Sequence, residues 1–236
     1  MKKISVCIII VALSVVSIFA RDITDKKHLV GINAGISFNT MGLQKDSRWD
    51  NSKNSIKPGA VVGFSYEYRA PKVFGLEIGA NYANRGTQQR FVDPNLNKRS
   101  FYRFNFHSIE TPLIMKFYMG KKKVFNLNVG GFVSYAFNVQ TRVKIDLKDN
   151  SIIEDTDERE NNFLGKHNDK DINGERPFRP YDAGVNVGFE FVSKMGLGVG
   201  ARVQQGLVDF TNPKFIFNDD KKVLHTNAII YMLFKI

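Results

Sequence analysis

Residues 125–147 alternate apolar and polar side chains with a period of two over an unusual length. The odd positions, from Phe125 to Leu147, are almost all apolar, whereas the even positions, from Asn126 to Asp146, are mostly polar. Successive side chains of a strand point to opposite faces, so the pattern predicts one long strand between an apolar and a polar environment. Strands of soluble proteins have about five or six residues. This length is typical of a membrane barrel, where roughly ten residues cross the lipid and the others project beyond it.

Further segments alternate in the same way and are predicted strands: residues 30–38, 60–69, 74–82, 102–117, 181–191, 197–204 and 228–236. In one of them, 102–117, the apolar parity changes, which predicts a β-bulge near residues 108–112.

The connectors between these strands alternate between short and long. The short ones are 70–72, 120–123 and 193–194, and the long polar ones are 39–57, 84–99, 148–176 and 211–222. Bacterial outer-membrane barrels have an even number of antiparallel strands, short periplasmic turns and longer outer loops. The sequence therefore predicts an all-β fold: an eight-stranded antiparallel up-and-down transmembrane β-barrel.

The N-terminal segment has the organisation of a secretion signal. Two lysines precede an apolar run over residues 4–18, which is too short for a spanning helix, and Ala20 offers a small residue for cleavage. We predict a signal peptide over residues 1–20 and an outer-membrane barrel domain over residues 21–236. The single cysteine, Cys7, lies in the signal, so no disulfide is expected in the mature chain.

The charge balance is basic, with 34 Lys and Arg, 23 Asp and Glu, and a net charge of +11. Nucleic acid is not expected as a partner, because the chain is predicted to be exported and no nucleic-acid-binding motif accompanies the charge. Lipid phosphates or acidic glycans are the expected counter-ions.

A soluble lipocalin-like barrel is the main alternative, since it also has eight alternating strands, with apolar side chains inside. The membrane barrel is favoured because the polar face is rich in glycine, as at Gly63, Gly130 and Gly188, which suits a crowded interior. The apolar face also carries aromatic residues close to the short turns, as an interfacial girdle would. These are Tyr66, Tyr68, Phe74, Phe117, Phe125, Phe189, Phe191 and Phe234. The expected location is the cell outer membrane.

The chain resembles the small PorT-like outer-membrane barrels of Bacteroidota at several segments. These are 31–39, Gly79-Ala80-Asn81-Tyr82, the segment 109–116 (IETPLIMK), Asp182-Ala183-Gly184 and Gly198-Val199-Gly200-Ala201. The resemblance covers nearly the whole mature chain and implies an outer-membrane barrel. One member of the family is linked to protein secretion, whereas most have no assigned activity.

The chain offers few candidates for catalysis. Outer-membrane hydrolases pair a histidine with Ser or Asp, and the candidates here are His107 with Ser108, and His225. No motif surrounds them, so we assign no catalytic residue and expect no enzymatic activity.

A short acidic segment matches the first half of a calcium-binding loop. Asp169, Asp171 and Asn173 stand at ligand positions, but Pro180 occupies the place of the required bidentate Glu. An ordinary solvated turn is the favoured interpretation, and we assign no metal ligand and no cofactor.

Charged residues of the predicted inner face lie within a few positions of a short turn and should share one depth in the barrel. They are Glu67, Glu77, Lys116, Glu190 and Arg202. An eight-stranded barrel is only just wide enough to be filled by side chains, and an unpaired buried charge costs several kcal/mol. We therefore predict a salt-bridged plug and a closed barrel; in a wider lumen these residues would instead meet water.

These observations predict a non-catalytic, monomeric outer-membrane barrel that acts through its long loops, in interaction or in envelope assembly or secretion. Its expected partners are outer-membrane lipid and other envelope or secretion proteins. The alternatives are a lipid- or peptide-modifying enzyme and a small-solute porin.

Overall fold

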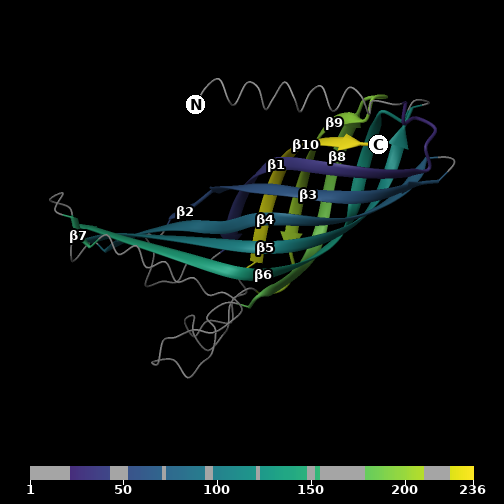
Figure 1. Ribbon diagram of the computed structural model, residues 1–236. Helices are drawn as coiled ribbons and strands as arrows, with labels where there is room; N and C mark the ends of the chain where they lie inside the picture. The colour runs from purple at the N-terminus through teal and green to yellow at the C-terminus, as the bar shows by residue number, and fades with distance from the viewer. Residues whose placement is uncertain are drawn as a thin grey trace, which may run out of the picture.

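The computed structural model describes residues 22–42, 53–70, 73–93, 98–120, 123–147, 152–154, 179–209 and 224–236. Within them lie eight long strands and two short ones (Figure 1). The long strands are β1 (His28–Gly42), β3 (Lys57–Arg69), β4 (Phe74–Asp93), β5 (Lys98–Met119), β6 (Phe125–Leu147), β8 (Tyr181–Val192), β9 (Leu197–Gly206) and β10 (Leu224–Lys235). The short strands are β2 (Lys53–Ser55) and β7 (Ile152–Glu154). No helix of the described residues is long and apolar enough to span a membrane.

The eight long strands form a closed antiparallel ring. Each pairs with the next along the chain, and β1 pairs with β10, where Gly31 lies opposite Lys235. The two short strands extend this ring, because β2 pairs with β4 and β7 pairs with β6. The predicted eight-stranded up-and-down barrel is confirmed.

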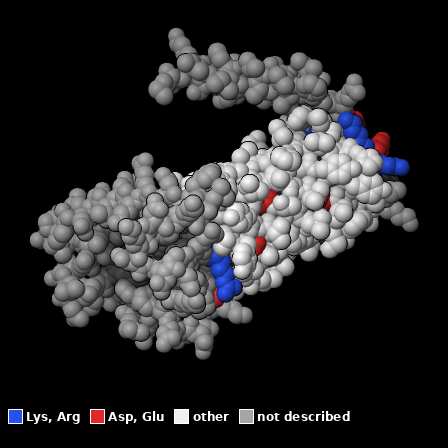
Figure 2. Space-filling model, turned by 60° about the horizontal axis from the view of Figure 1, so that its bottom comes forward, with Lys and Arg blue, Asp and Glu red and all other residues white. Residues whose placement is uncertain are grey.

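The outside of the barrel is apolar and the inside is polar, as predicted for a membrane barrel and opposite to a lipocalin. Side chains such as Phe64 (63% exposed) and Met232 (68% exposed) point outward, whereas Glu67, Lys116 and Asn128 are buried within the ring. On the face shown in Figure 2, the described Lys and Arg side chains lie toward the two ends, and the surface between them is mainly uncharged.

The two ends of the barrel differ in their connections. The turns β3–β4, β5–β6 and β8–β9 lie at one end, together with the start of β1 and the end of β10. We call this the short-turn end and the opposite one the long-loop end. The connectors predicted at 70–72, 120–123 and 193–194 thus lie where the pattern placed them.

One wall of the barrel is much taller than the other. Strands β4, β5 and β6 have 20, 22 and 23 residues, whereas β8, β9 and β10 have 12, 10 and 12. The long strands project as a sheet beyond the long-loop end (Figure 1). The prediction of a polar loop over residues 84–99 is wrong, because β4 continues to Asp93 and β5 begins at Lys98. These extensions were not predicted because their residues are mainly polar. A sheet that projects beyond the membrane has no lipid-facing side and therefore needs no apolar face.

A register shift does occur in the tall wall, but in a different strand from the predicted one. His107 pairs with Asn138 and Ser108 pairs with Ala136, which leaves Phe137 of β6 as the extra residue. The shift lies near residues 108–112 as predicted, but the prediction that β5 carries the extra residue is wrong, because β5 keeps one parity. Phe106 is buried inside, and Val139 packs against the apolar cluster that contains it.

Two sequence predictions lie outside the described residues. These are the signal peptide over residues 1–20 and the acidic segment with Asp169, Asp171 and Asn173.

Candidate functional site

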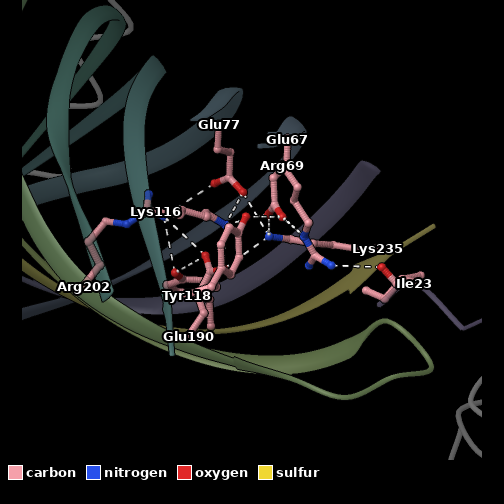
Figure 3. A network of polar contacts seen from close by, with 10 residues as sticks. Ile23, Glu67, Arg69, Glu77, Lys116, Tyr118, Glu190, Arg202 and Lys235 are labelled. Atoms are coloured by element: carbon pink, nitrogen blue, oxygen red, sulfur yellow. Dashed lines mark hydrogen bonds and ion pairs between the residues drawn. The ribbon is translucent and has the colours of Figure 1, made fainter. Parts of the chain in front are cut away.

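Charged and tyrosine side chains from six strands meet inside the barrel near the short-turn end (Figure 3). They are Glu67 and Arg69 of β3, Glu77 of β4, Lys116 and Tyr118 of β5, Glu190 of β8, Arg202 of β9, and Tyr231 and Lys235 of β10. All nine are buried. We call this group the ion-paired cluster.

Two lysines lie among three carboxylates at the centre of the ion-paired cluster. Lys116 Nζ donates to Oε2 of Glu67, Glu77 and Glu190 at 3.0, 2.5 and 2.6 Å. Lys235 Nζ donates to the same three oxygens at 2.5, 3.0 and 3.2 Å. Each ammonium group has three donors, so each lysine is saturated by three charge-assisted bonds. Because the carboxylates come from β3, β4 and β8, these bonds tie distant walls of the barrel together.

The Oε1 atoms of these three carboxylates have partners of their own. Glu67 Oε1 accepts from Arg69 Nε at 2.5 Å and from the Tyr118 hydroxyl at 2.7 Å. Glu190 Oε1 accepts from the Tyr231 hydroxyl at 2.8 Å, and Arg202 Nη2 lies 3.8 Å from the same oxygen. Arg202 Nη2 also lies 3.9 Å from Glu77 Oε1.

Glycines make room for both tyrosines. A Cβ atom on Gly75 would collide with the Tyr118 hydroxyl, and one on Gly200 would lie 2.5 Å from Cζ of Tyr231. Gly200 and Tyr231 are direct partners across β9 and β10. The absence of a side chain at these positions lets each ring lie flat against the wall and reach a carboxylate, which explains part of the glycine-rich inner face.

Residues that precede β1 lie across the short-turn end of the barrel. Ile23 is buried against an apolar cluster that includes Leu29, Val192 and Leu233. The Ile23 backbone N–H donates to Lys194 O at 3.0 Å, and its carbonyl accepts from Arg69 Nη1 at 2.9 Å. Ile23 therefore lies beside the ion-paired cluster and is joined to it through Arg69 (Figure 3).

The pairing of Glu67, Glu77, Lys116, Glu190 and Arg202 is confirmed, since these five residues belong to one network. Lys235 and Arg69 belong to it as well, and the sequence analysis missed their role. Parity could have found them: Lys235 alternates with the apolar residues of β10, and Arg69 follows Glu67 by two positions.

A second polar group lies farther toward the long-loop end, and we call it the Arg85 cluster. It consists of Arg85, Glu110, Asp182, Gln204 and Asn227. Arg85 forms an ion pair with Glu110, and its Nη1 lies 3.7 Å from Asp182 Oδ2. Gln204 accepts from Arg85 at 3.2 Å and from Asn227 at 2.8 Å, and donates to Glu110 Oε1 at 2.8 Å. None of these residues was predicted to form a site.

Within the described residues, neither histidine considered for catalysis forms a hydrogen bond with a serine. His107 Nδ1 lies 2.6 Å from the Tyr82 hydroxyl, toward the outside of the barrel. Ser108 is buried on the inner face and donates to Ala83 O at 3.0 Å. His225 is buried inside the lumen, and neither of its ring nitrogens has a hydrogen-bond partner within the described structure.

The three carboxylates of the ion-paired cluster are close enough to bind a metal, with oxygens of Glu67, Glu77 and Glu190 all within 4.8 Å of one another. The Oε2 atoms of all three, however, already accept hydrogen bonds from Lys116 and Lys235. Two ammonium groups occupy the place that a cation would take, so the arrangement is an ion-pair network.

A closed β-ring with an apolar outside and an ion-paired inside defines a transmembrane β-barrel protein. Residues 20–212 match the family described as the outer membrane protein beta-barrel domain, and the chain belongs to this family. The protein is thus located in the cell outer membrane, where barrels of this kind have their short turns on the periplasmic side.

Several solved outer-membrane proteins are similar in structure. Neisserial surface protein A has 13% identity and a TM-score of 0.45, over 88% of this chain and 97% of that one. Ail of Yersinia pestis has 10% identity and a TM-score of 0.40, over 89% and 99% of the two chains. The outer membrane enzyme PagL has 8% identity and a TM-score of 0.31, over 87% and 98%. None of the curated proteins matches the sequence.

Proposed function

We propose that this protein is a closed, non-catalytic outer-membrane barrel that acts through its long-loop end, in surface interaction or in envelope assembly or secretion. The ion-paired cluster carries this proposal, because two lysines bound to three carboxylates obstruct the lumen at the periplasmic end. A small cavity beside it, lined by Asn33, Ser65 and Asn81 among others, has a volume of ≈ 20 Å³. A cavity of this size holds about one or two waters.

The relationship to PorT-like barrels is part of the same proposal. The segment 109–116, on which that resemblance mainly rests, places Glu110 in the Arg85 cluster and Lys116 in the ion-paired cluster. Side chains of this segment thus form part of the polar interior of the barrel. A role in secretion would then depend on the connecting segments at the long-loop end.

Planar-bilayer recording tests the closed barrel. The wild-type protein is expected to show near-zero conductance, and a Lys116→Ala, Arg202→Ala double variant is expected to conduct because the network loses two of its cations. Steady single-channel conductance of the wild type would instead favour the small-solute porin.

Deletion of residues 150–173 tests the role of the long-loop end. The variant should insert normally but lose partner capture from intact cells. If a hydrolytic activity were found that disappears in His107→Ala or His225→Ala, the lipid- or peptide-modifying enzyme would replace this proposal. Ser108 and His225 line one cavity, but the Ser108 hydroxyl donates to Ala83 O and neither ring nitrogen of His225 has a hydrogen-bond partner within the described structure, which favours the non-catalytic interpretation.

A further inference from the structure

A small cavity lies in the lumen beside the Arg85 cluster, and we call it the His225 cavity. Its volume is ≈ 10 Å³, and Met41, Arg85, Asp182 and His225 are among the residues that line it. These four residues come from β1, β4, β8 and β10. A space of this size suits about one water molecule or one metal ion.

The imidazole of His225 is the polar group of this cavity that is least satisfied. His225 is only 3% exposed, and neither Nδ1 nor Nε2 has a hydrogen-bond partner in the part of the chain that the structure describes. A neutral imidazole has one N–H donor and one free lone pair, and leaving such groups unpaired in the interior costs free energy. A neutral imidazole is also the side chain that most often binds metals in proteins. His225 therefore offers a ligand atom inside the cavity.

The thioether of Met41 lies next to this imidazole. Met41 is the direct partner of His225 in the antiparallel pair of β1 and β10. Both side chains are buried, and both line the His225 cavity. The Cβ atoms of direct cross-strand partners are about 4.5–5.5 Å apart, so one ion can reach both side chains. The register of the closing strands thus brings a sulfur and a nitrogen ligand to one small space.

This pair of ligands favours a soft metal ion. Thioether sulfur selects Cu(I), and imidazole nitrogen also suits copper. Zinc needs three or four protein ligands. Among the described residues, however, His225 belongs to no group of three His, Cys, Asp or Glu side chains that could hold an ion. Cu(I) differs from zinc because it accepts a pair of ligands.

The charges at the cavity favour a monovalent ion over a divalent one. Arg85 and Asp182 both line the cavity, and Arg85 Nη1 lies 3.7 Å from Asp182 Oδ2. The two charges largely compensate each other, so the cavity offers little excess negative charge. Burying an ion without compensating charge is costly, and the cost rises with the charge of the ion. A singly charged ion is therefore the easier one to hold.

We propose that Met41 and His225 form a binding site for one Cu(I) ion. His225 is the second residue of β10 and Met41 the last but one of β1, so the site lies toward the long-loop end of the lumen. Outer-membrane barrels have this end on the outside, and the metal would enter from there. The assignment goes beyond the proposed function, because it holds whether or not the lumen conducts.

A Cu(I) titration of the folded protein in detergent, under anaerobic conditions, tests the proposal with bicinchoninate as the chromophoric competitor. The wild type should withdraw one Cu(I) per chain from the competitor. His225→Leu and Met41→Leu should each weaken binding by more than about 100-fold, because loss of an outer-shell partner alone already costs about 10–100-fold. Cys7 lies in the predicted signal peptide, so the mature chain adds no thiolate to the titration.

A matched variant removes the same two residue types elsewhere. His28→Leu, Met119→Leu changes two exposed residues at the short-turn end and should bind Cu(I) within about two-fold of the wild type. Heat-modifiable mobility on gels establishes that each variant is folded. If Met41→Leu failed to fold, X-ray absorption of the wild-type complex would test the same ligand, since its spectrum should show one sulfur neighbour of copper.

Four results would overturn the proposal. The first is a wild type that takes no stoichiometric Cu(I) from the competitor, and the second is an equal loss of binding in the matched variant. The third is an X-ray absorption spectrum without sulfur. The fourth is tighter binding of Zn(II) than of Cu(I), abolished by Asp182→Asn, which would identify a carboxylate–imidazole site instead.

Discussion

The two polar clusters in the lumen differ in how completely their groups are paired. In the ion-paired cluster, Lys116 and Lys235 each use three donors, and the carboxylate oxygens of Glu67 and Glu190 all have partners. In and beside the Arg85 cluster, Arg85 Nε and both ring nitrogens of His225 lack a hydrogen-bond partner within the described structure. The first cluster leaves one such atom, Arg202 Nε, whereas the second leaves several, among them Arg85 Nε and Asn227 Oδ1.

The walls from which the clusters are built account for this difference. The ion-paired cluster lies where all strands begin or end near short turns, so residues of similar depth meet from opposite sides. The Arg85 cluster lies where the tall wall starts to rise above the short one, and Gln204 and Asn227 of the short strands supply neutral amides in place of charges. The free energy of unfolding should therefore depend more on the ion-paired cluster than on the Arg85 cluster.

The largest effect is expected for Lys116→Ala. This change removes three charge-assisted bonds and leaves Glu67, Glu77 and Glu190 with one lysine fewer. Breaking a buried ion pair costs about 3–5 kcal/mol, and the free energy of unfolding should fall by that amount. Urea unfolding in lipid vesicles, followed by the folded band on unheated gels, measures it.

Lys194→Ala, at an exposed position of the short-turn end, is the control for Lys116→Ala and should change the free energy of unfolding by less than about 0.5 kcal/mol. A loss below about 1 kcal/mol in Lys116→Ala would mean that water replaces the lysine at no great cost. The distinction between the clusters would then disappear.

A smaller effect is expected for Gly200→Ala. The added Cβ would lie 2.5 Å from Cζ of Tyr231, so the ring must move and its bond to Glu190 is strained. Overpacking of this kind costs about 1–3 kcal/mol of unfolding free energy. Gly131→Ala is the matched control, since its Cβ would lie 3.4 Å from Gly184 O in ordinary contact. Equal stability of the two variants in the same urea series would contradict the tight fit of Tyr231.

The smallest effect is expected for His225→Leu, and it should have the opposite sign. His225 is buried with two unpartnered nitrogens, and leucine removes these groups while filling a similar volume. The free energy of unfolding should rise by about 1 kcal/mol. A decrease of that size would show that His225 has partners, such as bound water. The polar groups in and beside the Arg85 cluster would then be as completely paired as those of the ion-paired cluster.

The sequence predicts the barrel well because two-residue alternation survives wherever one side of a strand faces lipid. From Phe64 in β3 to Met232 in β10, the apolar positions lie on the outer face as expected. The same alternation places Glu67, Glu77, Lys116, Glu190 and Arg202 inside at one depth. Their pairing follows from charge and confinement, so this part of the site could be predicted.

The sequence predicts the structure less well beyond the lipid-facing part of the strands, where no outer face has to be apolar. Beyond the bulged Phe137, Val139 packs against the buried pair of Met41 and Phe106, so the alternation of β6 assigned it to the wrong face. The extension of β4 beyond Asn84 is polar and resembles a loop. The Arg85 cluster also escaped prediction, because it combines residues that are far apart in sequence and at unequal distances from any turn.

Lys235 lies in β10, the strand that closes the ring against β1. The Oε2 atoms of Glu67, Glu77 and Glu190 each accept from two ammonium groups, that of Lys116 in β5 and that of Lys235 in β10. Closing the ring between β1 and β10 therefore also completes the ion-paired cluster. Removal of β10 would cost the barrel its β1–β10 seam and three of its six lysine–carboxylate bonds at once, so the two losses are coupled.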